Sequence, residues 1–415
     1  MNWKHAAFLA ALAVVPSADA AESRIWMSRK GTTLEAELGT VQPPEVTLID
    51  KNMKSITLKI EDLSLADRQY LIEYGDAPED ILASGKPGLV EKEMRLDTSA
   101  FEKPDKELMI PEGPSEPLEL FKTPHFLIAS AGKVRPQPIA ETAERMWFGM
   151  AFEHMNFRRD WGDKRMLIIL AEDRDMYAAL GKWQAAVLRK MGQPDAATNR
   201  EAIWDRIGSS DVYLDDAFAK EHGVFDTARI FNIREPRQFR KDMAPFLVHC
   251  MADALLTKQM GGVSSYGSEG YFSLTTGHSY YKEISLAGKS ETQLLAVEES
   301  NKDEISSKSG FDDGSSWARS LKPLVRKGVV ALNLEHMLSW KSDDLDPAKL
   351  VTIYSFACYM EGDSKRLAQF AKLIRRIESS NQIPVPQEFA RIFGFETVEE
   401  LEADWKKFIV EGDFK

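Results

Sequence analysis

The sequence predicts an α+β protein with two folded parts, and three observations carry that prediction. Residues 22–74 alternate apolar and polar side chains in short runs, which is typical of half-buried β-strands. Residues 75–117 are rich in proline and in charged side chains, which favours an extended linker. Residues 118–415 combine strand-like apolar runs with long helical stretches. We therefore expect a small β module, a linker and a larger α+β domain that ends in helices.

The composition is that of a folded, acidic protein. The chain has 415 residues, of which 43% are hydrophobic, so it can bury a sizeable core. Its formal net charge of −12 argues against nucleic acids and anionic membrane surfaces as partners. The two cysteines, Cys250 and Cys358, either form a disulfide or remain as buried thiols, and buried thiols are the simpler expectation.

The first twenty residues have the pattern of a secretory signal peptide. Lys4 and His5 precede an apolar run at 6–15, and Pro16 and the small-residue site at 18–20 follow it. The apolar run is much shorter than the roughly 20 residues that a spanning helix needs. We expect cleavage before a mature chain that starts near residue 21, a periplasmic or secreted location, and no membrane anchor after cleavage.

The β module comes next in the chain. Strands are expected at 24–26, 33–38, 45–50 and 55–60, with turns at Gly31, Pro43-Pro44 and Lys51-Asn52 between them. A short capped helix at 62–71 is expected to close the module. The module contains no His or Cys, so its sequence offers no reactive centre.

An ordered set of residues in this module resembles the Sla-homology domain, an SH3-like small barrel. The set comprises Arg24, Trp26, Gly31, the strand at 35–38, Val46, Leu48, Leu63, Ser64, Asp67, Tyr70 and Leu71. The resemblance implies an SH3-like barrel over 22–74 and a protein or peptide partner. A module that merely packs on its neighbour is the alternative.

The segment 75–117 is expected to be a tether. It holds six prolines, eleven acidic residues and five basic residues, so it accounts for about half of the excess negative charge. Such a composition predicts that the segment buries little.

The large domain is expected to begin with a sheet and to end in helices. Strands are expected at 124–129, 164–170, 212–214 and 228–233, and helices at 138–156 and 236–260. Beyond a polar loop at 290–316, helices are expected at 329–340, 347–360, 365–377, 386–393 and 398–410. Thr397 and Glu400 have the spacing of a capping box at the start of the last helix.

The helix expected at 236–260 carries the most site-like residues. It is apolar nearly all round and is therefore expected to be buried. His249 and Asp253 lie four residues apart on one of its faces. Glu269 follows the Gly261-Gly262 break and is expected to begin a second helix, from which its carboxylate reaches the same spot.

Residues 249–253, HCMAD, and 266–270, YGSEG, resemble the central motifs of gluzincin-type zinc metallopeptidases. Those enzymes place two His ligands and a Glu base in an HExxH helix, and a Glu ligand in a following helix. The resemblance extends over most of 118–412 and implies a gluzincin-like α+β domain with C-terminal helices. It places His249 and Glu269 at ligand positions, with Cys250 where the base stands and Asp253 where the second His stands.

Two interpretations of His249, Asp253 and Glu269 remain open. In one, the three side chains hold a metal, with zinc as the candidate cofactor. In the other, which the two departures from the family pattern favour, they form a buried hydrogen-bonded network and no cofactor binds.

Catalysis has weaker support than binding. Cys250 at the general-base position cannot replace a carboxylate, and it points about 100° away from His249 around the helix, which disfavours a Cys–His pair. His278, Tyr280 and Tyr281 are possible site-lining residues, although core aromatics are the commoner role for such side chains.

The function expected from the sequence is that of an exported binding or scaffold protein. It would combine an inactive metallopeptidase-like domain with an SH3-like protein-binding module. An active zinc hydrolase with a His/Asp/Glu metal site is the alternative, and a ligand held by the β module alone is a third possibility.

Overall fold

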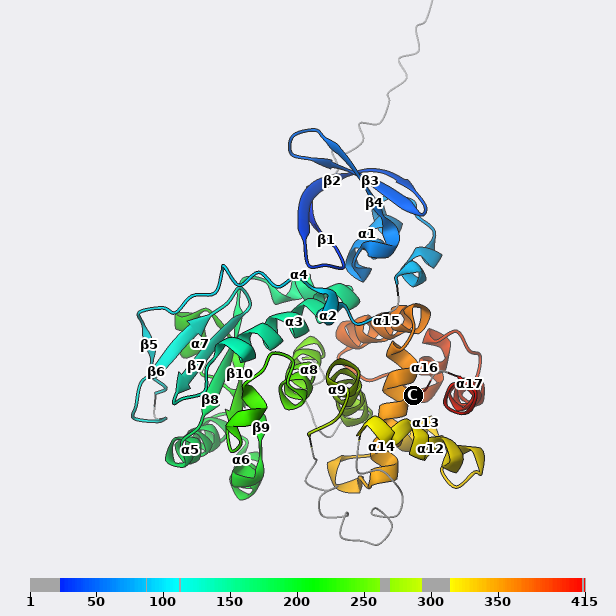
Figure 1. Ribbon diagram of the computed structural model, residues 1–415. Coiled ribbons are helices and arrows are strands. Elements are labelled where there is room, and N and C mark those ends of the chain that lie inside the picture. Colours follow the sequence, from blue (N-terminus) through cyan, green and yellow to red (C-terminus); the bar gives the residue numbers. More distant parts are fainter. Residues whose placement is uncertain are drawn as a thin grey trace, which may run out of the picture.

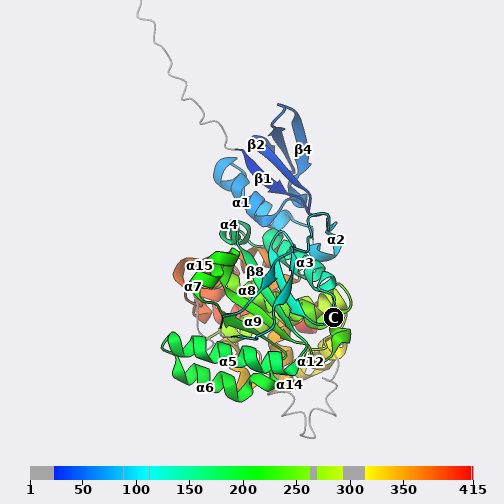
Figure 2. The same cartoon turned by 90° about the vertical axis from the view of Figure 1, so that its left-hand side faces the viewer.

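The computed structural model describes residues 23–86, 88–111, 113–261, 269–292, 314–412 and 414 (Figure 1). The expected signal peptide, residues 266–268 of the second motif and most of the loop expected at 290–316 lie outside the described residues. The described chain is α+β, as the sequence predicts. A small N-terminal module stands beside a larger body in which a sheet is followed by a group of helices (Figures 1 and 2).

The N-terminal module is an antiparallel sheet with a helix beside it. Its strands pair in chain order and are β1 (Arg24–Met27), β2 (Thr33–Gln42), β3 (Glu45–Asp50) and β4 (Ser55–Lys59). Within the described residues this sheet is open, with β1 and β4 at its edges. Helix α1 (Leu65–Tyr74) begins after Ser64, whose hydroxyl accepts a hydrogen bond from the Asp67 N–H. All four expected strands and the closing helix are therefore present.

Trp26 and Asp67 join the parts of the module. Trp26 is buried in its core and donates its indole N–H to the Ala36 carbonyl at 3.0 Å. Asp67 is fully buried and accepts hydrogen bonds from the Arg24 guanidinium at 2.7 Å and the Met27 N–H at 2.8 Å. Arg158 of the large body also reaches Asp67, at 3.3 Å. One buried carboxylate thus fastens the module to itself and to its neighbour.

The segment 75–117 is anchored to the rest of the protein, and the expectation that it buries little is wrong. It contains η2 (Glu79–Ser84), α2 (Val90–Glu93) and β5 (Glu107–Leu108). Several of its apolar side chains are buried, namely Ile81, Leu82, Val90, Leu108 and Ile110, although Met109 is exposed. The average composition of the segment does not reveal these buried residues. A few apolar side chains at intervals are enough to hold a charged, proline-rich segment against the rest of the protein.

The large body is built on a six-stranded mixed sheet in the order β5-β6-β7-β8-β10-β9. Its further strands are β6 (Leu118–Lys122), β7 (Phe126–Ala131), β8 (Arg165–Ala171), β9 (Ser209–Tyr213) and β10 (Val224–Asn232). The central strands β7, β8 and β10 run parallel, whereas β9 is an antiparallel edge strand. The four expected strands are all present, with shifted bounds.

Helices cover both faces of this sheet. Alternate residues of β7 enter two different cores: Phe126 and Ile128 join the larger one, and Leu127 and Ala129 join the smaller one. The helices around the sheet are α3 (Gln137–Glu153), α4 (Phe157–Trp161), α5 (Arg174–Lys190), α6 (Pro194–Ile203) and α7 (Asp216–His222). Because both faces are covered, β8 is an unbroken apolar run.

The remaining helices pack beside the sheet (Figure 1). They are α8 (Pro245–Gln259), α9 (Tyr271–Ala287), α12 (Trp317–Arg326), α13 (Leu334–Ser339), α14 (Pro347–Glu361), α15 (Ser364–Ser380), α16 (Pro386–Ile392) and α17 (Val398–Val410). The capping box of Thr397 and Glu400 is present as expected. No helix among the described residues is long and apolar enough to cross a membrane.

Two expected helices of the large body begin at least five residues later than the sequence suggests, whereas α1 and α9 begin two or three residues later than expected. The helix expected from residue 236 is divided into η4 (Pro236–Phe239) and α8, because Met243 adopts a left-handed φ of 56° and Pro245 fits only in a first turn. The helix expected from residue 329 begins at Leu334. Asn333 caps it by accepting a hydrogen bond from the His336 N–H.

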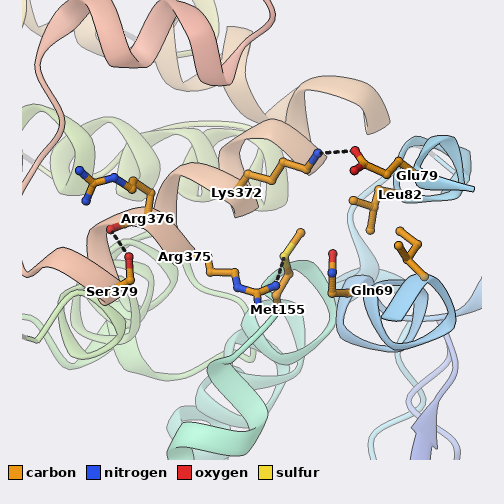
Figure 3. A pocket seen from close by; sticks show the side chains of 9 residues that line it. Gln69, Glu79, Leu82, Met155, Lys372, Arg375, Arg376 and Ser379 are labelled. Atoms are coloured by element: carbon orange, nitrogen blue, oxygen red, sulfur yellow. Dashed lines mark hydrogen bonds and ion pairs between the residues drawn. The ribbon is translucent and has the colours of Figure 1, made fainter. Parts of the chain in front are cut away.

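A cavity of about 370 Å³ lies at the seam between the module and α15 (Figure 3). Lys372 and Arg375 reach into it from α15, and Gln69 and Glu79 line it from α1 and η2. Lys372 contacts the Glu79 carboxylate at 3.5 Å. The seam therefore has a polar wall on either side, and exposed ion pairs of this kind stabilise a fold weakly.

Candidate functional site

A groove of about 1460 Å³ opens where the sheet edge meets α8 and α9. The start of β9 contributes Gly208 and Ser209 to its lining, and α8 contributes His249, Cys250 and Asp253. The segment before α8 and the chain just after α9 complete the walls. The groove thus contains the helix that the sequence marks as the most site-like.

His249 is buried and directed toward α9. Its Nδ1 lies 2.9 Å from Oε2 of Glu283, and its ring meets the edge of Tyr280 with 4.5 Å between centroids. Glu283 is fully buried and has further donors on both oxygens. These donors are the Ser290 hydroxyl at 3.0 Å, the Glu291 N–H at 2.7 Å, and the Thr292 N–H and hydroxyl at 3.1 Å. The carboxylate therefore fixes both the imidazole and the chain that leaves α9.

Asp253 belongs to a different network, directed toward the sheet. Its Oδ2 accepts a hydrogen bond from Arg229 of β10 at 2.9 Å, and the same guanidinium lies 3.1 Å from Asp211 of β9. Arg229 also donates to the Ser209 hydroxyl at 2.7 Å. Burial disfavours the charge of Arg229, but the two carboxylates outweigh it and raise the pKa of Arg229 above its usual value.

The structure therefore assigns His249 and Asp253 to separate partners. Glu269 is exposed in the turn that precedes α9, whose N-cap is Gly270. Across the described ranges, no group of three or more His, Cys, Asp or Glu side chains is arranged to hold a metal ion. The partners Glu283 and Arg229 were not predicted from the sequence. For Arg229 the available signal was a single charged residue within the apolar strand run at 228–231, whereas Glu283 directly follows Lys282 and does not stand out.

Cys250 is a buried thiol in the groove wall. Burial raises its pKa to about 11, so the neutral thiol predominates at neutral pH. Cys358 is also free and buried, and burial raises its pKa as well. The two cysteines are thus unpaired, as the simpler expectation had it.

The three possible lining residues on α9 have three different roles. His278 faces Glu361 of α14, with its Nδ1 at 2.9 and 3.0 Å from the two carboxylate oxygens. Tyr280 lies beside His249 and donates its hydroxyl to the Thr292 carbonyl at 3.0 Å. Tyr281 donates to the Glu361 carbonyl at 3.2 Å. The residues by which α9 lines the groove are instead Phe272, Thr275, Thr276, Leu286 and Ala287.

A second group of titratable side chains is sealed inside the protein. Lys282 of α9 lies 2.8 Å from Glu91 of α2 and 2.5 Å from Glu153 of α3, and all three are buried. His278 and Glu361 lie beside them. Burial disfavours the Lys282 ammonium, but Glu153 and Glu91 outweigh that effect and raise its pKa well above the usual value. The segment 75–117 thus places a carboxylate in the core of the large body.

The rest of this buried cluster is strongly perturbed. Burial lowers the pKa of His278 to about 3 and raises the pKa of Glu361 to about 8. Burial also raises the pKa of Glu153 to about 7. Within the described chain, Oε2 of Glu91, Nδ1 of His154 and Nε2 of His278 have no hydrogen-bond partner. Such atoms are costly to bury, so this cluster is under more electrostatic strain than the groove.

The fold and the groove define a class of protein: an α+β protein whose mixed sheet presents an antiparallel edge strand beside two buried helices. Comparison with family models, with curated proteins and with solved structures finds no match to this chain. The chemistry of the groove is therefore the basis for its function. A neutral thiol, an imidazole held by a carboxylate and an aspartate held by an arginine give the groove a polar wall.

Proposed function

We propose that this chain is an exported binding protein whose groove holds an extended segment of a partner protein without cleaving it. One observation carries the proposal. The groove of about 1460 Å³ is lined by polar side chains of α8 that are already engaged, His249 by Glu283 and Asp253 by Arg229. Side chains that are already engaged in this way can orient a ligand through the polar atoms that their partners leave free, and the shape of the groove adds to this. They do not supply a metal-bound water or an activated nucleophile.

The proposal includes the fold that the sequence resemblance implies, a gluzincin-like domain that has lost its reaction. The order of elements supports it, because a mixed sheet with an antiparallel edge strand precedes α8 and α9. Cys250 at the position of the base has no carboxylate with which to take a proton from a metal-bound water. A protein with this site would retain the peptide-sized groove without the hydrolysis.

The edge strand gives the groove a means of holding extended chains. Gly208 and Ser209 line it at the start of β9, and a peptide can add to a sheet edge through main-chain hydrogen bonds. Phe246 and Phe272 are half-buried in the same lining and offer apolar contacts for alternate side chains. Backbone contacts would give affinity, and the aromatic side chains would give selectivity.

We propose that the N-terminal module is an SH3-like unit that adds a second contact surface. Tyr74 is 68% exposed and stacks on Tyr70 at 4.5 Å between centroids, and Ile25 is 54% exposed. Exposed aromatic and apolar side chains of this kind are typical of peptide-binding surfaces. Because Arg158 of the large body pairs with Asp67 of the module, the module surface and the groove would be held in a fixed position relative to each other.

Binding is tested with fluorescent peptides of about ten residues, long enough to follow a strand edge. Fluorescence polarisation with the full mature chain should show saturable binding, and mass spectrometry should recover the peptides intact. The variant Gln238→Trp, which fills the groove, should weaken binding about tenfold or more. Lys406→Trp, on α17 outside the groove lining, is the matched control and should bind normally. Equal binding by both variants would place the ligand elsewhere.

Metal analysis tests the proposed absence of a reaction. The purified protein, exchanged into chelator-free buffer and supplied with zinc, is assayed for bound metal and for peptide cleavage. We expect no stoichiometric zinc in the wild type or in His249→Ala. Stoichiometric zinc that disappears in His249→Ala, together with peptide cleavage, would establish the hydrolase alternative instead.

A further inference from the structure

The charge of the groove is opposite in sign to that of the whole chain. The described lining contains more cationic side chains than carboxylates, although the chain has a formal net charge of −12. The cationic residues are Arg206, Arg229, Arg234, Arg237, Lys241 and Lys289, and the acidic residues are Glu235, Asp242, Asp253 and Glu291. An acidic protein has therefore gathered positive charge around one concave surface.

The four carboxylates of the lining are already held by cations. The pairs are Asp253 with Arg229 at 2.9 Å, Glu235 with Arg237 at 2.7 Å, Glu291 with Lys289 at 2.6 Å, and Asp242 with Arg145 at 2.8 Å. Arg145 belongs to α3 and neutralises Asp242 from outside the lining. A ligand in the groove would therefore meet little uncompensated negative charge.

Arg234 and Lys241 are two lining cations that these pairs leave uncompensated. Both are exposed, and neither forms an ion pair within the described part of the chain. They lie at the two ends of the segment 234–241, which is part of the connection between β10 and α8 and contains four basic residues and one acidic residue; Asp242, which Arg145 pairs, follows it directly. This segment makes one rim of the groove cationic.

The groove also offers apolar contacts beside this rim. Phe246 and Phe272 are half-buried in the lining. At physiological ionic strength charges more than about 8 Å apart are largely screened, so a bound ligand senses the rim and not the net charge of the chain. The complementary ligand therefore has carboxylates and apolar side chains together.

We propose that the groove selects acidic peptide segments, in which carboxylate side chains pair with Arg234 and Lys241 and apolar side chains contact Phe246 and Phe272. This inference rests on the proposed function and specifies the ligand class of the same groove. Guanidinium and ammonium groups on a solvent-accessible rim would contribute discrimination and salt dependence more than raw affinity.

The test compares peptides that share one apolar framework and carry several glutamates, several lysines or several glutamines. Polarisation titrations with the full mature chain, at about 0.15 M salt, should show the glutamate peptide binding about tenfold more tightly than the lysine peptide. Raising the salt severalfold should reduce that preference. The double variant Arg234→Glu/Lys241→Glu should lose the preference for glutamate.

A matched double variant tests whether the change in net charge alone removes the preference for glutamate. Arg391→Glu/Lys406→Glu makes the same change in net charge on α16 and α17, outside the groove lining, and should keep the glutamate preference. Equal binding of all three peptides would overturn this inference and leave the proposed function standing. Binding of none of them would overturn both. A glutamate preference that survives Arg234→Glu/Lys241→Glu would overturn the assignment to this groove.

Discussion

Two histidine–glutamate pairs each have one member on α9, and the two pairs differ in the charge of their surroundings. Glu283 of α9 holds His249 at the groove, and His278 of α9 is held by Glu361 inside the protein. At the groove, uncharged hydroxyl and amide donors complete the coordination of Glu283. Inside, the neighbours are the charged Lys282 and two further carboxylates, and several polar atoms have no hydrogen-bond partner among the residues that the structure describes.

This difference in surroundings separates a pair that lies at the proposed binding groove from a cluster that is sealed in the core. Neutral hydrogen bonds hold the groove pair in place with no demand for a counter-charge. The buried cluster depends on one ammonium to offset carboxylates that come from α2, α3 and α14. Removing that ammonium would leave buried charge uncompensated, which is among the most destabilising changes a core can suffer.

The largest expected effect is therefore that of Lys282→Met. The change leaves Glu91 and Glu153 buried without their cation and should lower the free energy of unfolding by about 3–5 kcal/mol. Urea denaturation followed by tryptophan fluorescence measures it. Lys289→Met, which removes an exposed partner of Glu291, is the control and should cost about 0–1 kcal/mol. A loss below about 1 kcal/mol for Lys282→Met would show that the cluster does not rely on its ammonium.

The variant Glu283→Gln tests the His249–Glu283 pair at the groove. The amide retains one acceptor oxygen but presents an NH2 group to donors, so it should lower the free energy of unfolding by about 1–3 kcal/mol. It should also speed amide hydrogen exchange at Glu291 and Thr292, because a neutral amide oxygen accepts hydrogen bonds from their N–H groups more weakly than a carboxylate oxygen does. Glu291→Gln, which keeps that backbone donor, should leave the exchange of Thr292 unchanged. Unaltered exchange in Glu283→Gln would mean that the carboxylate does not fix this segment.

Much of the fold was predictable from the sequence, because strands and helix caps are local patterns. Eight strands were located from alternation and apolar runs, and the capping box from the spacing of Thr397 and Glu400, whereas β5, β6 and the helices α5, α6 and α7 were not predicted. The break before α8 was less visible. Residues 236–260 were interpreted as one helix from their periodicity, and the left-handed Met243 that lies between η4 and α8 is not a residue type that commonly marks a turn.

The site was predictable only in part, because hydrogen-bond partners are set by tertiary packing. His249 and Asp253 are adjacent on one helix face, which suggested a shared network. Packing instead gave His249 a partner 34 residues later in the chain and Asp253 a partner 24 residues earlier. A helical wheel places side chains on a face but does not identify which neighbouring element supplies the partner.

The buried pair should also make the stability of the protein depend on pH. The pKa of Glu361 is raised to about 8, so the folded state retains a proton that the unfolded state releases above about 4.5. Stability attributable to Glu361 is therefore lost as the pH rises from about 4.5 to about 8. His278 acts in the opposite direction, because its pKa is lowered to about 3, but its contribution is complete above about 6.5.

Between about pH 6.5 and 8, the pH dependence of stability is therefore expected to come from the buried carboxyl groups. Glu361 contributes over the whole of this range, and Glu153 contributes up to about pH 7. The free energy of unfolding should fall with a slope of up to about 1.4 kcal/mol per pH unit for each titrating group. Urea titrations at intervals across this window measure the slope, and Glu361→Gln should flatten most of it. A slope that Glu361→Gln leaves intact would assign the pH dependence to other groups.

The smallest expected effect is that of a change at the seam between the N-terminal module and α15. An exposed ion pair there can be compared with the buried pairs of Lys282. Lys372 lies 3.5 Å from Glu79, and both side chains are solvent-exposed (Figure 3). Lys372→Ala should therefore change the free energy of unfolding by less than about 1 kcal/mol, and added salt should reduce the change further. Charge alone does not make a lysine important in this fold: Lys282 and Lys372 each face a glutamate, and burial sets the difference between them. A loss for Lys372→Ala as large as that for Lys282→Met would remove burial as the explanation.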